Sequence, residues 1–155
     1  MMQKAIRRKD RASSDEEARN LMTNCAYGVL ATADLAAQPY AVPLSYVFRE
    51  HAIYFHCANE GHKLDNLNAN PAVSFCVVGQ TRVLPDMFST EYESAIAFGS
   101  AHKVEGSEKE EALLLILEKY APGFITQGKQ YLAARLEQVT VFRIDVQRLS
   151  GKARR

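Results

Sequence analysis

The clearest hydrophobic pattern in the sequence is the strict alternation of apolar and polar side chains over residues 139–146. Phe142, Ile144 and Val146 fall on one side, and charged or polar residues alternate with them. Successive side chains of a strand point to opposite faces, so this alternation predicts a half-buried antiparallel strand.

Five other segments have the length and composition of strands, and they span residues 26–33, 40–49, 51–56, 73–78 and 92–105. Pro43 interrupts the second of them and predicts an edge, a bend or a bulge. Gly99 lies inside the last one and predicts a bulge or close approach by another group. Residues 79–90 contain Pro85 and are predicted to form a long loop.

Helix signals lie between these segments. Ser14 and Glu17 have the spacing of a capping box, which predicts a helix through about Cys25. Ser107 and Glu110 have the same spacing ahead of a leucine-rich helix over residues 112–120. Shorter helices are predicted after Gly61 and over residues 130–136. Six antiparallel strands joined by short turns, with helices between them, predict a mainly β member of the α+β class built on a small barrel.

The predicted core consists of residues on the apolar faces of these elements or inside continuous apolar runs. It comprises Val29, Leu30, Val47, Phe55, Leu64, Phe75, Val77, Leu117, Phe142 and Ile144.

Composition narrows the class of protein. The 155 residues predict one domain, 1–155, in which residues 1–12 form a basic N-terminal arm without the apolar region of a secretory signal. A formal net charge of +1 argues against a nucleic-acid binder. No apolar run approaches the roughly 20 residues that a membrane-spanning helix needs. Three cysteines, an odd number, fit a reducing cytoplasm better than a disulfide framework.

Residues 53–70 carry the strongest functional signal. A strand with an aromatic pair runs into a turn at Gly61, and a short helix follows that Pro71 ends. We expect Leu64 and Leu67 on one side of this helix, with His62, Lys63 and Asn66 toward the other. The free amides and positive dipole of a helix start, next to basic side chains, favour an anion. The segment therefore predicts a phosphate site.

Other chemistry for the same residues fits less well. His56, Cys57, His62 and Cys76 are all zinc-ligand types, but their spacing lacks a C-x-x-C or closed tetrahedral pattern, and no metal site is predicted. His56 and Cys57 are neighbours on a strand, so their side chains point to opposite faces and do not form a nucleophile–base pair.

The order of several short motifs resembles a known family. These motifs are 7–11 before the first helix, Tyr27-Gly28-Val29-Leu30-Ala31, residues 38–46, residues 53–58 with Gly61-His62-Lys63, Asn70-Pro71, residues 92–99, and Ser150-Gly151-Lys152. Together they resemble the pyridoxamine 5′-phosphate oxidase-like, FMN-binding split-barrel superfamily, and within it the nitroimidazole-resistance (Nim-type) branch. The resemblance implies a six-stranded antiparallel split β-barrel with flanking helices, and a homodimer with FMN at the subunit interface.

The resemblance also implies cofactor-binding positions. They are Val42, Pro43, Leu44 and Ser45 along the isoalloxazine ring, Phe55, His56 and Cys57 facing the ribityl chain and ring, His62 and Lys63 at the phosphate, Asn66 one helical turn further, and Ser94 reaching the flavin from the other subunit. Many relatives carry arginine where this chain has His62. The arginine-rich C-terminal pattern of the vitamin B6 oxidase is not present, which argues against vitamin B6 oxidation.

Three hypotheses about function follow. The first is an FMN-dependent oxidoreductase, with reduction of nitroimidazoles or other nitro-aromatic compounds as proposed for the Nim branch. The second is a non-catalytic flavin- or haem-binding protein for storage or sensing, with His56 or His62 as an axial ligand. The third is a structural dimer without a ligand. The sequence identifies no catalytic residue, substrate or electron donor.

Overall fold

The computed structural model describes residues 4–155 of the chain. Residues 1–3 of the predicted basic N-terminal segment, 1–12, therefore lie outside the described residues. The strands are β1 (Gly28–Ala33), β2 (Pro39–Leu44), β3 (Val47–Arg49), β4 (Ala52–Ala58), β5 (Ala72–Leu84), β6 (Ser89–Val104) and β7 (Val139–Arg154). The α-helices are α1 (Asp15–Asn24), α2 (His62–Ala69), α3 (Gly106–Tyr120) and α4 (Ile125–Arg135). Four short 3-10 helices are η1 (Lys9–Arg11), η2 (Pro85–Met87), η3 (Pro122–Phe124) and η4 (Leu136–Gln138).

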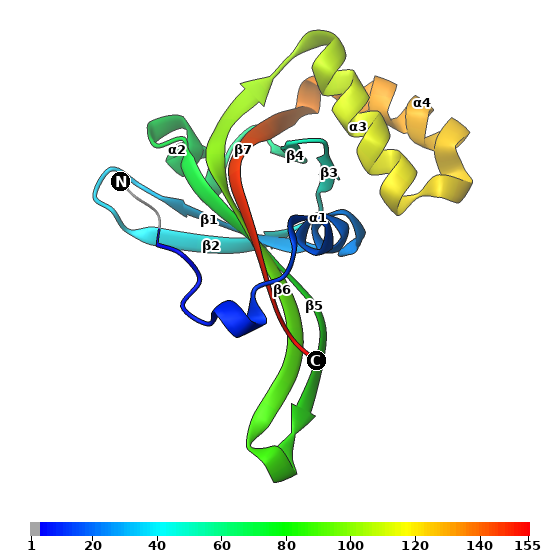
Figure 1. Ribbon diagram of the computed structural model, residues 1–155. Helices are drawn as coiled ribbons and strands as arrows, with labels where there is room; N and C mark the ends of the chain where they lie inside the picture. Colours follow the sequence, from blue (N-terminus) through cyan, green and yellow to red (C-terminus); the bar gives the residue numbers. More distant parts are fainter. Residues whose placement is uncertain (1–3) are drawn as a thin grey trace.

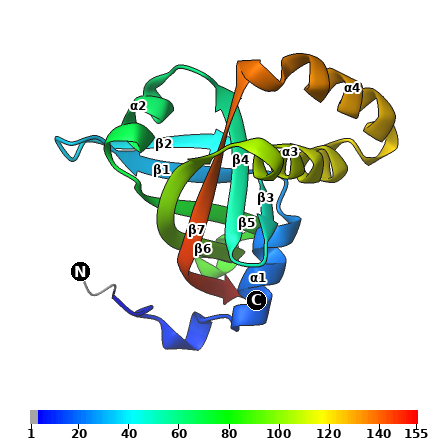
Figure 2. The ribbon, with the colours of Figure 1, turned by 90° about the horizontal axis from the view of Figure 1, so that it is seen from above.

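All seven strands belong to one antiparallel sheet with the order β2-β1-β5-β6-β7-β4-β3. The edge strands β2 and β3 follow each other in the chain, separated by Ser45 and Tyr46, so the sheet curls round and the chain links its two unpaired edges at this corner (Figures 1 and 2). The result is the predicted split barrel. It has seven strands where six were expected, because the segment 40–49 divides at the corner.

The interior of the barrel is aromatic and aliphatic. Phe55 of β4 and Phe142 of β7 are paired in register, and their rings stack at a centroid distance of 5.6 Å. Seven of the ten predicted core residues are buried, and the other three, Val29, Val47 and Leu117, are only half-buried. Val47 was misassigned because the chain bends at the Ser45–Tyr46 corner, which turns Phe48 inward in its place.

The first predicted capping box is confirmed and the second is wrong. Ser14 caps α1, its hydroxyl accepting from the Glu17 amide at 3.1 Å while the Glu17 carboxylate accepts from the Ser14 amide at 2.9 Å. The third helix instead begins at Gly106, whose φ of +61° turns the chain out of β6, so Ser107 already lies inside the helix and cannot cap it.

The predicted loop over residues 79–90 is also wrong. Strand β5 continues to Leu84 and β6 starts at Ser89, pairing from Thr81↔Tyr92 to Leu84↔Ser89. Residues 79–91 thus form a two-stranded projection, here called the arm, which extends from the body of the barrel (Figure 1). Strand β7 likewise continues through the predicted tail and ends at Arg154, opposite Tyr92 at the base of the arm.

Helices cover parts of the barrel. Ala18 and Met22 of α1 are buried in the main core. Helices α3 and α4 pack over β7 and the end of β6, forming a second core of Val104, Ala112, Leu113 and Val141. In residues 4–155 no helix is long and apolar enough to cross a bilayer.

Candidate functional site

The start of α2 has the features of an anion site. Gly61 precedes the helix with φ +135°, a conformation that favours glycine. The first helical bond runs from the Asp65 amide to the Gly61 carbonyl at 3.1 Å, which leaves the amides of His62, Lys63 and Leu64 without helical partners. Within the described chain no side chain caps this end. Lys63 is half-buried and His62 is exposed, so a cation and free amides lie together here.

The two histidines predicted at the site lie close to this helix start. The ring of His62 packs on that of Tyr40 from β2, with centroids 4.1 Å apart. His56 points outward from β4, and its pKa is lowered by desolvation among the surrounding protein atoms and by the positive charge of Lys63. Since the shift favours the neutral imidazole, His56 offers a ring nitrogen lone pair or an N–H at neutral pH.

Phe55 and Cys57 face the barrel interior, where both are buried. Burial raises the pKa of the Cys57 thiol. Their side chains are therefore part of the core, and a ligand on the outer surface of β4 meets the His56 side chain between them. The predicted opposite orientation of His56 and Cys57 is confirmed.

Asn66 lies on the buried side of α2, together with Leu64 and Leu67, contrary to the expectation that it faces the other way. Its side-chain amide donates to the Thr32 hydroxyl at 3.0 Å, and that hydroxyl in turn donates to the Tyr40 carbonyl at 3.4 Å. Asn66 thus attaches α2 to β1 and β2. It fixes where the helix start points.

The segment Val42–Ser45 alternates in direction. Val42 and Leu44 pack against the core, whereas Pro43 and Ser45 are exposed. Pro43 lies opposite Val29 on the outer face of the sheet. Pro43 and Ser45 are therefore the most exposed residues of this predicted ring-binding segment.

The corner after Ser45 is held by residues that the sequence analysis missed. The Tyr46 ring is fully buried, and its hydroxyl donates to the Met22 carbonyl. The hydroxyl of Tyr120, from the end of α3, accepts from the Tyr46 amide at 2.9 Å and lies 2.7 Å from the Ala26 carbonyl. Lys119 lies over the Tyr46 ring, 4.0 Å from its centroid, and donates to the Cys25 carbonyl at 2.9 Å. A Lys-Tyr pair at a helix end carries no motif that would reveal this role.

Ser94 lies apart from the other predicted residues of the same chain. Its hydroxyl donates to the Lys152 carbonyl at 3.5 Å, beside a cavity of about 310 Å³ between α1, the first half of β6 and the end of β7. The end of α2 meets β6 at Ala101, whose amide donates to the Pro71 carbonyl. Seven residues of strand, roughly 23 Å, separate Ala101 from Ser94. Ser94 therefore lies well along β6 from the point where the end of α2 contacts that strand.

The outer face of β2, β1, β5 and β6 is built from small and apolar side chains that are half-buried or exposed. Its members include Ala41, Pro43, Val29, Ala31, Cys76, Val78, Ile96 and Phe98. Ile96 is 37% exposed and Val78 is 57% exposed. Such a continuous apolar sheet face is typical of a surface that another molecule covers.

The cysteines and histidines form no metal centre in the described structure. Cys25, Cys57 and Cys76 are free thiols. Residues 4–155 contain no group of three or more histidine, cysteine, aspartate or glutamate side chains placed to hold a metal ion.

An antiparallel sheet that curls into a barrel, with a basic strand–turn–helix corner, places this protein in the class of split β-barrels. A family model for pyridoxamine 5′-phosphate oxidase matches residues 14–153, so the chain belongs to the pyridoxamine 5′-phosphate oxidase family. A search of curated proteins gives no match.

Solved structures show the same fold at low sequence identity. A candidate 5-nitroimidazole antibiotic resistance protein from Bacteroides thetaiotaomicron superposes with a TM-score of 0.78 and 22% identity, over 91% of this chain and 84% of that one. The FAD and haem binding protein from Mycobacterium smegmatis has a TM-score of 0.80 and 17% identity, with 92% and 73% covered. HutZ, the haem storage protein from Vibrio cholerae, has a TM-score of 0.66 and 19% identity, with 87% and 92% covered.

Proposed function

We propose that the protein is a flavoprotein that binds FMN between two copies of the chain, with the flavin phosphate at the start of α2. The observation that carries this proposal is the combination of unpaired amides, Lys63 and His62 at a helix start that no side chain of the described chain caps. A phosphate carries close to two negative charges and three strong acceptor oxygens. The donors present at this site match that chemistry.

The two-chain arrangement follows from the placement of the remaining residues. Pro43 and Ser45 are exposed near β1, and Ser94 lies roughly 23 Å along β6 from the residue that contacts the end of α2. A second copy packed on the apolar outer face would place its Ser94 near the first copy's helix start. Twofold symmetric dimers are the commonest oligomers, and they use one patch on both copies.

The activity we propose is that of an oxidoreductase. FMN, when bound, supplies hydride or single-electron transfer. The chain would hold the phosphate with Lys63, keep neutral His56 near the cofactor as a hydrogen-bond partner, and place the ring against Pro43. The likeness to a nitroimidazole resistance protein supports nitro-aromatic compounds as the substrate class. Three free thiols favour a reducing, cytoplasmic setting.

Replacing Lys63 by alanine tests the phosphate site. Loss of one charge-assisted contact costs roughly 1.5–3 kcal/mol, which corresponds to about a 10- to 150-fold weaker affinity for FMN. Riboflavin has no phosphate, so its affinity should hardly change. The measurement is a titration of each apoprotein with both ligands, following the quenching of flavin fluorescence.

Lys129→Ala is the matched control, because Lys129 is exposed on α4, on the other side of the barrel from α2 (Figure 1). This variant should bind both ligands like the wild type. Equal losses of FMN and riboflavin affinity in Lys63→Ala would mean that Lys63 supports the shape of the pocket. Unchanged affinity for both would place the phosphate elsewhere, with Lys152 the next candidate.

A second candidate function is haem binding for storage or sensing. It is favoured by His56, whose lowered pKa keeps an outward-facing imidazole neutral and therefore able to coordinate iron. Two of the structures described above are of haem-binding proteins. Addition of haemin to the apoprotein would then give a Soret band that shifts in His56→Ala.

A further inference from the structure

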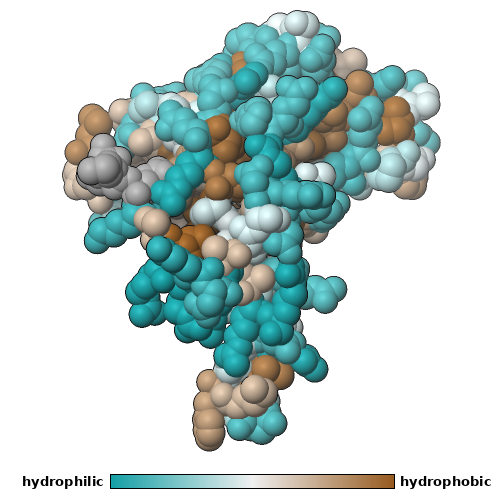
Figure 3. Space-filling view, in the orientation of Figure 1, coloured by the Kyte–Doolittle hydropathy of each residue, from teal (hydrophilic) through white to brown (hydrophobic). Residues whose placement is uncertain are grey.

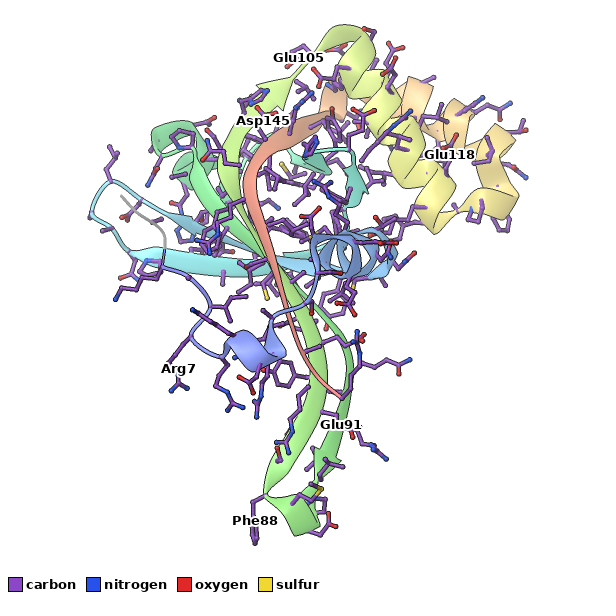
Figure 4. All side chains as sticks on the ribbon, viewed as in Figure 1. Arg7, Phe88, Glu91, Glu105, Glu118 and Asp145 are labelled. Carbon is purple, nitrogen blue, oxygen red and sulfur yellow. The ribbon has the colours of Figure 1, made fainter. Side chains whose placement is uncertain are left out.

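The arm ends in exposed apolar side chains. Phe88 is 97% exposed, Met87 is 58% exposed and Val83 is 70% exposed. Figure 4 shows Phe88 at the extremity of the molecule, pointing away from the body, and Figure 3 shows the apolar colouring of this end. Large apolar side chains gathered at a tip, away from the chain's own core, indicate a contact with another molecule.

Within residues 4–155 the arm also has little support from the rest of the chain. Strand β7 accompanies β6 only as far as the Tyr92↔Arg154 pair, so beyond that point the arm is two strands wide. An isolated two-stranded hairpin is marginally stable in water. An ion pair between Arg82 and Glu91, at 2.7 Å, joins the two strands, but exposed pairs of this kind contribute little.

The exposed surface area of the whole chain also favours an interface with another molecule. The chain exposes 9717 Å². A compact monomer of its mass, 17.3 kDa, exposes about 7,800 Å² by the general scaling of surface with mass. The excess is about 1,900 Å², and burying about 800 Å² on each partner already makes a specific interface of standard size.

The charge of the arm and its continuity with the outer sheet face favour a second copy of the chain as the partner. Residues 79–91 contain Arg82, Asp86 and Glu91, a net charge of −1, which disfavours anionic membranes and nucleic acids. The arm is also continuous with the outer sheet face through Val78 and Ile96, which are themselves exposed. A second copy that covers this face would therefore lie next to the arm.

We propose that the arm of each copy docks on the second copy, next to the flavin site to which Ser94 of the arm's own chain contributes. In this proposal Phe88 is the apolar anchor of the contact. The inference rests on the proposed dimer and goes beyond it. Since Ser94 lies only a few residues beyond the arm on β6, a chain whose Ser94 reaches the partner's flavin site brings its arm next to that site.

The chain contains no tryptophan, so Phe88→Trp introduces a single reporter. At concentrations where sedimentation shows a dimer, its emission should be blue-shifted and several-fold less quenched by iodide than free tryptophan. Dilution to monomer should shift the emission to the red. Phe124→Trp is the control, because Phe124 is 64% exposed in the α3–α4 connection and should report an exposed ring at every concentration.

Phe88→Ser provides a second measurement. It should raise the dimer dissociation constant several-fold, while Phe124→Ser should leave it unchanged. A dimer in which the indole of the Phe88→Trp variant is as exposed as that of the Phe124→Trp variant would overturn the docking of the arm and leave the dimer standing. A dimer whose stability is unaffected by Phe88→Ser would do the same. A wild-type chain that binds FMN as a monomer would overturn both proposals.

Discussion

The stacked pair Phe55 and Phe142 allows the contribution of the barrel interior to stability to be measured by a single substitution. Phe142 is 1% exposed and its ring lies nearly parallel to that of Phe55, at an interplanar angle of 9°. Replacing Phe142 by alanine removes the buried ring and leaves a cavity. Such substitutions cost about 3–5 kcal/mol, of which the aromatic pair itself accounts for about 0.5–1.5 kcal/mol.

The loss is measured by urea unfolding, followed by circular dichroism at one fixed protein concentration, because a dimer's stability depends on concentration. With a typical slope of about 2 kcal/mol per molar urea, the midpoint should fall by about 2 M. Phe124→Ala, at an exposed ring, should stay within about 0.5 kcal/mol of the wild type. A Phe142→Ala midpoint equal to that of the control would show that β7 does not present this face to the core.

Two further predictions concern the supports around the barrel. Tyr120→Phe leaves the Tyr46 amide without its acceptor at the β2–β3 corner and should cost roughly 1–3 kcal/mol, measured by the same unfolding assay; an unchanged midpoint would contradict the role of the Tyr120 hydroxyl. Bonds from Arg143 and Tyr54 lower the pKa of Glu108, so its contribution is present above its unfolded pKa of about 4.5 and is lost as pH falls through the folded value. Since Glu108 is 41% exposed, Glu108→Gln should lower stability by only about 0.5–1 kcal/mol at pH 7 and converge with the wild type in acid; a difference that persists at low pH would exclude the carboxylate as its source.

The sequence predicted those parts of the fold in which local chemistry and burial agree. The capping box of Ser14 and Glu17, and the alternation that buries Phe142 and Ile144, were both confirmed. The arm was missed because both of its faces are exposed in one chain, so no inward–outward alternation marks residues 79–90 as strands. Gly79 and Pro85 reinforced the appearance of a loop.

The candidate site was predictable to a similar extent. A glycine followed by two basic residues placed His62 and Lys63 at a helix start, as the structure has them. Asn66 was assigned to the wrong side of α2 because a buried polar residue has no sequence signature until its partner, Thr32, is known. Tyr40 and Tyr120 act through contacts with residues distant in sequence, which local patterns do not encode.

The central claim, that two copies of this chain bind FMN, is tested most directly by one sedimentation measurement. Sedimentation with absorbance detection at a flavin wavelength, on purified protein with added FMN, measures the mass of the species and the bound flavin together. The account predicts a dimer that carries two FMN molecules. A protein that sediments without flavin absorbance at saturating FMN, or that carries it as a monomer, would contradict the account.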